Sequence, residues 1–240
     1  MSEFWAYPDN WAGVSMNEKE TISLVTSYVG KLLRTRFGKG PESVNVFLCD
    51  QCIVFHLRNF MGPVEKFLLT QEEEKAFRYT RELLMESLLP ELKAFLEENT
   101  GLSVTEFYYD WGVHNASGAI VGVFGSSLDQ TEAYPGKEDV HEKVINVTAA
   151  IQKVPEHIDS WWVTPKMLAV FRQGITVLLE KEMVELGYTE VLKAAKRRLE
   201  KRMLEQDANA GAILNKTLTD LYADWDFDRD RSIVIYIFKE

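Results

Sequence analysis

Apolar residues along the chain recur first at helical spacing, then at strand spacing, and this order occurs twice. From residue 18 to residue 36 the apolar positions lie three or four apart, which predicts an amphipathic helix. Short runs rich in valine, isoleucine and phenylalanine then predict strands. The elements predicted for the first half are a helix over 18–36, strands over 44–50 and 52–60, helices over 64–69 and 70–100, and strands over 104–111 and 118–124.

Local signals place the ends of the long helix in this half. Thr70 and Glu73 match a T-x-x-E capping box, which predicts that the helix begins there. Pro90 predicts a kink or a break inside it, and Gly101 predicts its end.

The second half follows the same order after a polar segment that contains Pro135 and Gly136. Its predicted elements are a helix over 140–154, strands over 159–164 and 166–174, helices over 177–186 and 189–204, and a hairpin that ends at the C-terminus.

The two halves also share residues in one register. The stretch that ends at Phe124 aligns without a gap on the stretch that ends at Phe238, and Asp110 and Trp111 align with the Asp-Trp pair that begins at Asp224. The offset is 114 residues, which is the size of a domain rather than of a solenoid repeat. The sequence therefore predicts one fold written twice.

Antiparallel hairpins separated by helices predict an α+β fold made of two tandem helix-hairpin-helix-hairpin repeats. We expect antiparallel sheets with helices packed on one face, in a pseudo-twofold arrangement that resembles a homodimer joined by a linker. The predicted parts are an aromatic-rich N-terminal arm over 1–20, a first repeat over 21–125, a linker over 126–139 and a second, divergent repeat over 140–240.

Composition excludes some classes of protein. The chain has 240 residues, a net charge of -10 and a pI near 5.1, and an acidic protein is a poor general binder of nucleic acid because phosphate contacts need clustered cations. The sequence contains no run of about 20 apolar residues, so it predicts no membrane span. The first residues lack the basic segment and apolar run of a signal peptide, and two cysteines do not make a disulfide framework. We expect a cytoplasmic protein.

One candidate polar site is repeated in both halves. Its residues recur at the same offset and could form a ligand or interface site, or equally a turn and an ion pair that set how the first helix meets the hairpin. They are Lys39, Glu42 and Arg58 in the first half, and Lys153, Glu156 and Arg172 in the second.

One helix of the second half is strongly basic within this acidic chain. Its cations could form a docking face for an acidic partner, lipid headgroups or a phosphate, or a solvated helix face that pairs with nearby carboxylates, which is the more common case. The residues of this candidate docking face are Lys193, Lys196, Arg197 and Lys201.

Two further motifs have a chemical and a structural interpretation. Cys49 and Cys52 form a C-x-x-C pair, which is half of a zinc site or a redox pair, or simply two small apolar residues at a strand turn. Four aspartates alternate from Asp224 to Asp230, and the first three resemble the start of an EF-hand loop, but the glycine and the final glutamate of that loop are absent. The structural interpretation is a charged hairpin tip that discourages edge pairing.

No constellation of catalytic residues is visible. The four histidines show no ligand spacing, and no Ser/His/Asp set, P-loop or dinucleotide glycine motif occurs. We therefore expect a protein that is not an enzyme, with no catalytic residues, no cofactor and no metal site.

Three motifs carry a resemblance to a known family. FGKGPESVNVF, NFMGPVEKFLL and RELLMESLLPELKAFLEENTGLSV resemble the bacterial MpsC-type domain family, named after a sodium-translocating, membrane-potential-generating system, over residues 22–124. The family usually contains a single unit, so this chain resembles a tandem double unit. The resemblance implies a small soluble domain encoded with or near membrane transport functions, and it supplies no catalytic residues.

These observations favour a non-enzymatic cytoplasmic accessory or regulatory protein, linked to a membrane transport or signalling system through protein contacts. The expected partner is a protein, such as a member of a membrane-associated complex, and a homodimer is an alternative. A second hypothesis is a small-ligand or nucleotide sensor that binds between the two repeats near Arg58 and Arg172. A third is an enzyme or a redox or zinc protein that uses Cys49 and Cys52.

Overall fold

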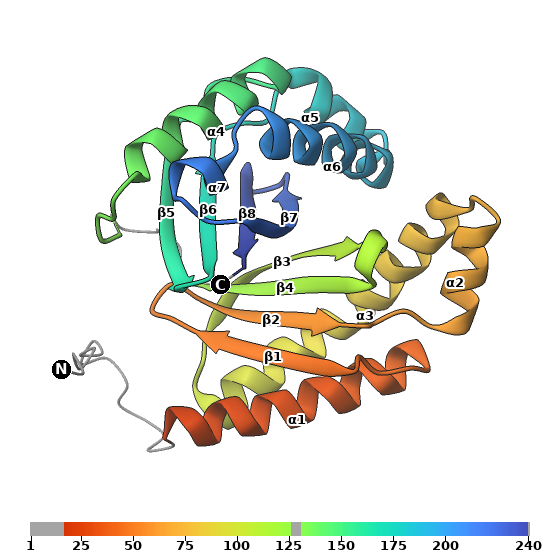
Figure 1. Cartoon of the computed structure of the whole chain (residues 1–240). Coiled ribbons are helices and arrows are strands. Elements are labelled where there is room, and N and C mark those ends of the chain that lie inside the picture. The colour runs from red at the N-terminus through yellow and green to blue at the C-terminus, as the bar shows by residue number, and fades with distance from the viewer. Residues whose placement is uncertain (1–16, 126–130, 240) are drawn as a thin grey trace. The chain divides into compact units, whose positions relative to one another are not determined.

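A computed structural model shows the fold of the protein (Figure 1), and it describes residues 17–125 and 131–239. Most of the predicted N-terminal arm and residues 126–130 of the predicted linker lie outside the described residues. The chain divides into two compact units, and the second consists of Tyr108–Ile120 together with Ser127–Glu240. The tip of the second hairpin therefore belongs to the second unit.

The first copy contains a four-stranded sheet in the order β1-β2-β4-β3. Helices α1 and α3 pack against each other, and α1 also packs on β1 (Figure 1). The elements are α1 (Glu18–Phe37), β1 (Ser43–Leu48), β2 (Cys52–Arg58), α2 (Pro63–Thr70), α3 (Glu74–Thr100), β3 (Val104–Gly112), a short 3-10 turn η1 (Val113–Asn115) and β4 (Ser117–Phe124).

The second copy has the same strand order, β5-β6-β8-β7. Its helix α4 packs on β5 and on α6, and α6 packs on β7. The elements are α4 (Lys137–Ile151), β5 (His157–Thr164), β6 (Met167–Gln173), α5 (Leu178–Glu185), α6 (Thr189–Gln206), α7 (Ala210–Ile213), β7 (Leu218–Asp226) and β8 (Arg231–Phe238). The predicted α+β fold with two similar halves is confirmed.

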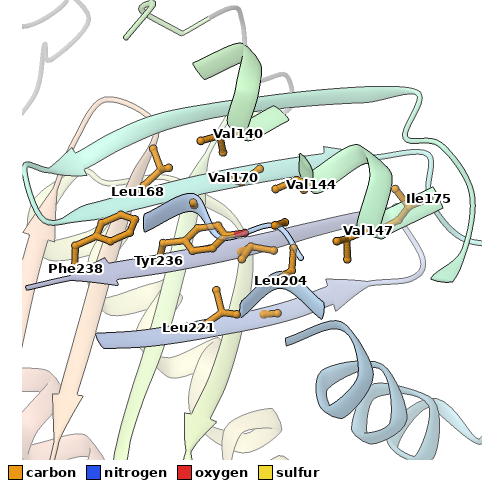
Figure 2. Close-up of a cluster of buried hydrophobic side chains, with 14 of the residues drawn as sticks. Val140, Val144, Val147, Leu168, Val170, Ile175, Leu204, Leu221, Tyr236 and Phe238 are labelled. Carbon is orange, nitrogen blue, oxygen red and sulfur yellow. The ribbon is translucent and has the colours of Figure 1, made fainter. Parts of the chain in front are cut away.

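The core of the second unit lies between its helices and its sheet (Figure 2). Val140 and Val144 on α4 face Leu168 on β6, and Tyr236 on β8 lies in the same cluster. All four side chains are fully buried. Complete burial of such a side chain is worth about 1.5 to 3 kcal/mol, so this cluster joins α4 to the sheet.

The first helix follows the pattern that the sequence predicts. Asn17 caps it with a capping box to Glu20, and Gly38 ends it with φ of 71°, a conformation that glycine adopts without steric cost. Val25, Val29 and other residues of its predicted stripe are buried.

Two predictions about the long helix are wrong or incomplete, and one short helix of the second half was not predicted. Thr70 is the last residue of α2, where its hydroxyl donates to the Phe67 carbonyl, and Glu73 makes no side-chain cap for α3. Half of such a box is instead present at the start of α2, where the Glu65 carboxylate accepts from the Gly62 backbone N–H, although Gly62 has no side chain to complete it. Pro90 lies inside α3 without dividing it, and the four-residue helix α7 is too short for periodicity to reveal.

Strand register differs between the two first hairpins. In the first copy Ser43 pairs with Arg58, so the offset of 114 would pair His157 with Arg172. His157 pairs with Gln173 instead, and a further irregularity lies between Trp162 and Thr164. The extra residue of a bulge shifts the pairing on one side of it, so equivalent residues of the two hairpins have different partners.

Candidate functional site

The first-copy members of the candidate polar site hold a turn together. The Lys39 ammonium donates to the Met61 carbonyl at 3.1 Å. The Glu42 carboxylate accepts from the Asn59 amide at 3.0 Å, and the Glu42 backbone N–H donates to the Arg58 carbonyl at 2.9 Å. The Arg58 side chain is exposed. These contacts join the start of β1 to the end of β2 and to the segment that leads to α2.

The second-copy members have two different environments. Lys153 and Glu156 form an ion pair at 3.2 Å that is largely exposed. Arg172 is completely buried, whereas its counterpart Arg58 is exposed. The structure therefore does not give the two arginines the same surroundings, and Arg172 offers no exposed atom to a ligand.

Arg172 lies at the centre of a buried ion-pair network in the second unit. Its guanidinium pairs with the Glu200 carboxylate on α6, and neither side chain is exposed. It also donates to the Thr148 hydroxyl on α4 at 2.8 Å and to the Ser232 hydroxyl on β8 at 3.0 Å. One side chain thus connects two helices to two strands.

A second ion pair continues this network toward α5. The Lys196 ammonium on α6 donates to the Glu180 carboxylate at 2.8 Å, and both side chains are buried. Glu180 also accepts from Gln152 at 2.8 Å and from the Val177 backbone at 3.0 Å. Burial lowers the pKa of Lys196, and the contact with Glu180 opposes this effect. The four charges of the network, from Arg172, Glu200, Lys196 and Glu180, cancel.

A second polar cluster, which we call the aspartate-pair cluster, is built around Asp110, Asp224 and Arg197. The two aspartates occupy equivalent positions in the duplicated sequence, and both are buried. The Tyr109 backbone N–H donates to the Asp224 carboxylate at 2.9 Å, and the Ala223 backbone N–H donates to the Asp110 carboxylate at 3.2 Å. Each aspartate therefore binds the residue that precedes the other.

Arg197 completes this exchange of hydrogen bonds. It donates to the Tyr109 carbonyl at 3.1 Å and to the Ala223 carbonyl at 3.3 Å. It also pairs with Asp224 at 2.7 Å and with Asp110 at 3.4 Å. The Arg197 guanidinium thus binds one backbone carbonyl and one aspartate carboxylate on each of the equivalent strands β3 and β7. All of these residues belong to the second unit.

The four cations of the candidate docking face are paired with carboxylates or buried, so they do not form an exposed basic surface. Lys193 pairs with Asp224 at 3.2 Å and Lys201 pairs with Asp110 at 2.7 Å. Lys196 and Arg197 are buried in the contacts described above. The other interpretation of the sequence, pairing with nearby carboxylates, describes these cations, but the pairs lie inside the unit rather than on a solvated face.

The spacing of these residues carries a signal for their burial. Positions 193, 196, 197, 200, 201 and 204 lie three or four apart, so they share one face of α6. Leu204 on that face is fully buried. Cations in the same stripe as a core leucine must find carboxylates inside the protein, because an unpaired buried charge is costly.

A third polar group surrounds Asp159 and His141. Asp159 accepts from the Lys137 ammonium, the Thr131 backbone and the Ser160 backbone, at 2.7 to 2.9 Å. The His141 ring lies 2.7 Å from the Ser160 hydroxyl. Burial acts to raise the pKa of Asp159, but these hydrogen bonds outweigh it and the pKa lies below its ordinary value.

Neither metal motif gains ligands in the described part of the chain. No group of three or more histidine, cysteine, aspartate or glutamate side chains there could hold a metal ion. Asp230 accepts instead from the Ile175 and Thr176 backbones at 2.9 and 2.7 Å. It anchors the turn after β6, which is a structural role for the last aspartate of the EF-hand-like run.

Exposed apolar side chains on two short helices were missed by the sequence analysis. Val64 and Phe67 on α2 are exposed by 72% and 62%, and Leu178 and Leu179 on α5 by 84% and 71%. These helices follow β2 and β6, so they are equivalent in the two copies. The signal is present in the sequence, because each helix has more large apolar residues than one buried stripe needs.

The fold and its polar clusters define a duplicated α+β protein, in which one chain contains two four-stranded sheets with the same strand order. Residues 17–126 match the model of the family described as the Na+-translocating membrane potential-generating system (MpsC). The match confirms the resemblance that the motifs indicate, and its family description links the domain to a membrane-potential system. Searches of curated proteins and of solved structures found no match. Among the residues of 17–125 and 131–239, no helix has the length and apolar character needed to cross a membrane.

Proposed function

We propose that this chain is a non-enzymatic accessory or regulatory protein that acts in the cytoplasm through protein contacts with a membrane transport or signalling system. The observation that supports it most is the pair of equivalent helices, α2 and α5, which expose large apolar side chains. Large apolar side chains that are grouped on one element and exposed to solvent are typical of protein interaction sites.

The apolar surface of α5 extends into the start of α6. Leu186, Tyr188 and Val191 are all more than half exposed, and they follow Leu178 and Leu179 along the chain. Removing such side chains from water on binding is worth about 25 cal/mol per Å². The proposed partner is therefore a protein of the membrane-potential system that presents an apolar surface.

The polar clusters support a role without catalysis. In the network of Arg172 and in the aspartate-pair cluster, the charged groups bind other charged groups, hydroxyl and amide side chains, or backbone atoms. A catalytic acid, base or nucleophile must be positioned to reach a substrate. These groups instead fix helices to strands.

Co-purification with variants of the apolar helices tests the proposal. The tagged full chain would be recovered from its own cells in mild detergent, and bound proteins identified by mass spectrometry. We expect an integral membrane protein of a transport or signalling system with the wild type. Leu178→Ser/Leu179→Ser or Val64→Ser/Phe67→Ser should reduce its recovery at least tenfold.

Val154→Ser is the matched control, because Val154 is equally exposed but lies outside these helices. It should recover the partner at the wild-type level. Equal recovery with every variant, or no membrane protein of this kind in any of them, contradicts the proposal. Binding of the purified chain to protein-free lipid vesicles would also contradict it, because the apolar helices would then contact lipid.

A further inference from the structure

Two thiols face each other across the turn between β1 and β2. Cys49 and Cys52 are not joined by a disulfide, and their Sγ atoms lie 3.5 Å apart. The Cys49 backbone N–H donates to the Cys52 carbonyl at 3.0 Å. Because Leu48 pairs with Ile53, the two cysteines continue the register as directly opposed residues, so their side chains lie on the same face.

This geometry is compatible with a disulfide. Opposed residues of an antiparallel pair have Cα atoms about 4.5 to 5.5 Å apart, and disulfides join residues whose Cα atoms are about 4.4 to 6.8 Å apart. The sulfurs must close from 3.5 Å to about 2.05 Å. A rotation of side chains accomplishes this approach while the backbone hydrogen bond of the turn stays in place.

The two thiols differ in exposure. Cys49 is partly exposed, whereas Cys52 is completely buried. A disulfide in solution can therefore reach the first thiol but not the second. This asymmetry assigns an order of reaction, in which Cys49 reacts with the external disulfide and Cys52 reacts afterwards with Cys49.

We propose that Cys49 and Cys52 form a reversible redox pair that exchanges with low-molecular-weight disulfides. The Cys49 thiolate attacks one sulfur of the small disulfide, forms a mixed disulfide and releases one small thiol. The Cys52 thiolate then attacks the Cys49 sulfur and releases the second small thiol. The two protein thiols are oxidised to one disulfide, and one small disulfide is reduced to two thiols, which take up the two protons that Cys49 and Cys52 lose.

The turn connects this pair to the end of the first sheet. The Gln51 carbonyl, between the cysteines, accepts from the Phe124 backbone N–H at 2.9 Å. Phe124 is the last residue of β4. Oxidation therefore constrains a turn that is hydrogen-bonded to the end of β4.

The pair belongs to the first copy alone. The equivalent positions of the second copy are Val163 and Lys166. The equivalent turn of the second copy therefore has no thiols and cannot form this disulfide. The ring that the disulfide closes is small, and short loops give the least stabilisation. Reduction by small thiols should therefore restore the dithiol without unfolding the protein.

Exchange with glutathione disulfide tests this order of reaction. The folded full chain would be incubated with excess glutathione disulfide, remaining thiols alkylated, and the products identified by intact mass. Wild type should lose both thiols and carry no glutathione. Cys52→Ala should keep one glutathione on Cys49, and Cys49→Ala should react at least tenfold more slowly than Cys52→Ala. Dithiothreitol should return the wild type to two thiols.

Three results would overturn the proposal. In the first, the wild type still has two alkylatable thiols at a time when Cys52→Ala has reacted fully. In the second, the wild type keeps a stable mixed disulfide. In the third, the two single variants react at the same rate. Thermal unfolding under reducing conditions verifies that each variant is folded. Repeating the exchange in denaturant shows that both cysteines are reactive once exposed. The outcome does not depend on the proposed partner, since it uses the purified chain.

Discussion

The Arg172–Glu200 ion pair shows how much the stability of the second unit depends on single residues. Both side chains are completely buried, and the arginine also holds Thr148 and Ser232. Bringing two charges out of water is costly, and their mutual attraction offsets that cost only while both are present. The pair therefore makes the fold sensitive to loss of either partner.

We predict that Arg172→Met lowers the free energy of unfolding by about 3 to 5 kcal/mol, because it leaves the Glu200 carboxylate buried without its cation. Arg172→Met/Glu200→Leu should recover most of this loss. Lys153→Met, in the exposed pair with Glu156, should change the free energy by at most about 1 kcal/mol. Urea unfolding measures all three, and a double variant no more stable than Arg172→Met would contradict the prediction.

His141 provides a pH-dependent contribution to stability. Burial lowers its pKa below the ordinary 6.5, and the Lys137 ammonium and His157 act in the same direction. Asp159 and Glu138 oppose them. As the pH falls below about 6.5, the unfolded chain binds a proton more readily than the folded one, so stability present above that pH is lost.

His141→Gln should therefore flatten the dependence of the unfolding free energy on pH between about pH 7 and pH 5. His114→Gln, at an exposed histidine, should keep the wild-type slope. The measurement is urea unfolding at several pH values. A wild-type slope in His141→Gln would show that this imidazole makes no such contribution.

Sequence identified the charged residues of interest but not their surroundings. Arg58 and Arg172 occupy equivalent positions, yet one is exposed and the other is buried. The difference accompanies a change of strand register, which no gapless alignment can show. The carboxylate partners of Lys193 and Lys201 lie 31 and 91 residues away in the chain, so local periodicity could not reveal them.

At the scale of elements, the side chain of Arg81 joins α2 to α3. Arg81 on α3 is buried and donates to the Glu65 carboxylate on α2 at 2.7 and 3.0 Å. Its guanidinium also lies over the rings of Phe60 and Phe77, at 4.7 and 4.8 Å from their centres. The planar fork of arginine makes both kinds of contact at once, which lysine cannot do.

Arg81→Lys should destabilise the protein by at least about 1.5 kcal/mol, the value of one hydrogen bond to a charged group. Hydrogen exchange followed by mass spectrometry should show that Arg81→Lys accelerates exchange in α2 more than in α1, relative to the wild type. Arg78→Lys is the control, since Arg78 pairs with Glu74 within α3 at a more exposed position. Unchanged exchange of α2 in Arg81→Lys would contradict this role.

Most elements could be predicted because their signals are local. The stripe of α1, the hairpins and the glycine at the end of α3 depend on residues near in sequence. The failures have identifiable causes. Thr70 satisfies its hydroxyl within α2, and Pro90 is accommodated in a helix whose stripe, including Leu88 and Leu92 on either side of it, is buried. Tertiary packing can thus outweigh a local signal.

For the molecule as a whole, the duplicated sequence does not divide where the compact units divide. Tyr108–Ile120 comes from the first copy but belongs to the second unit. Its contacts there include Asp110 with Lys201, and Ser117 with Tyr222 at 2.5 Å. The second copy alone would therefore lack part of its unit.

We predict that a chain cut between residues 125 and 131 after folding stays together as one species. Size-exclusion chromatography of the cut protein should give one peak that contains both fragments. Asp110→Ala/Asp224→Ala should allow the fragments to separate at a lower urea concentration than in the wild type. The control is Asp228→Ala, an exposed aspartate in the turn after β7. Separation of the wild-type fragments without denaturant would refute the prediction.

The exchange between Asp110 and Asp224 also has a consequence for how the two copies came to share one chain. Each aspartate binds the backbone of the residue before the other, and Arg197 serves both sides. Two identical chains could make the same reciprocal contact, because a symmetric interface requires one surface that complements itself. Gene fusion would then have turned an encounter governed by concentration into a permanent one, and left the second copy able to diverge.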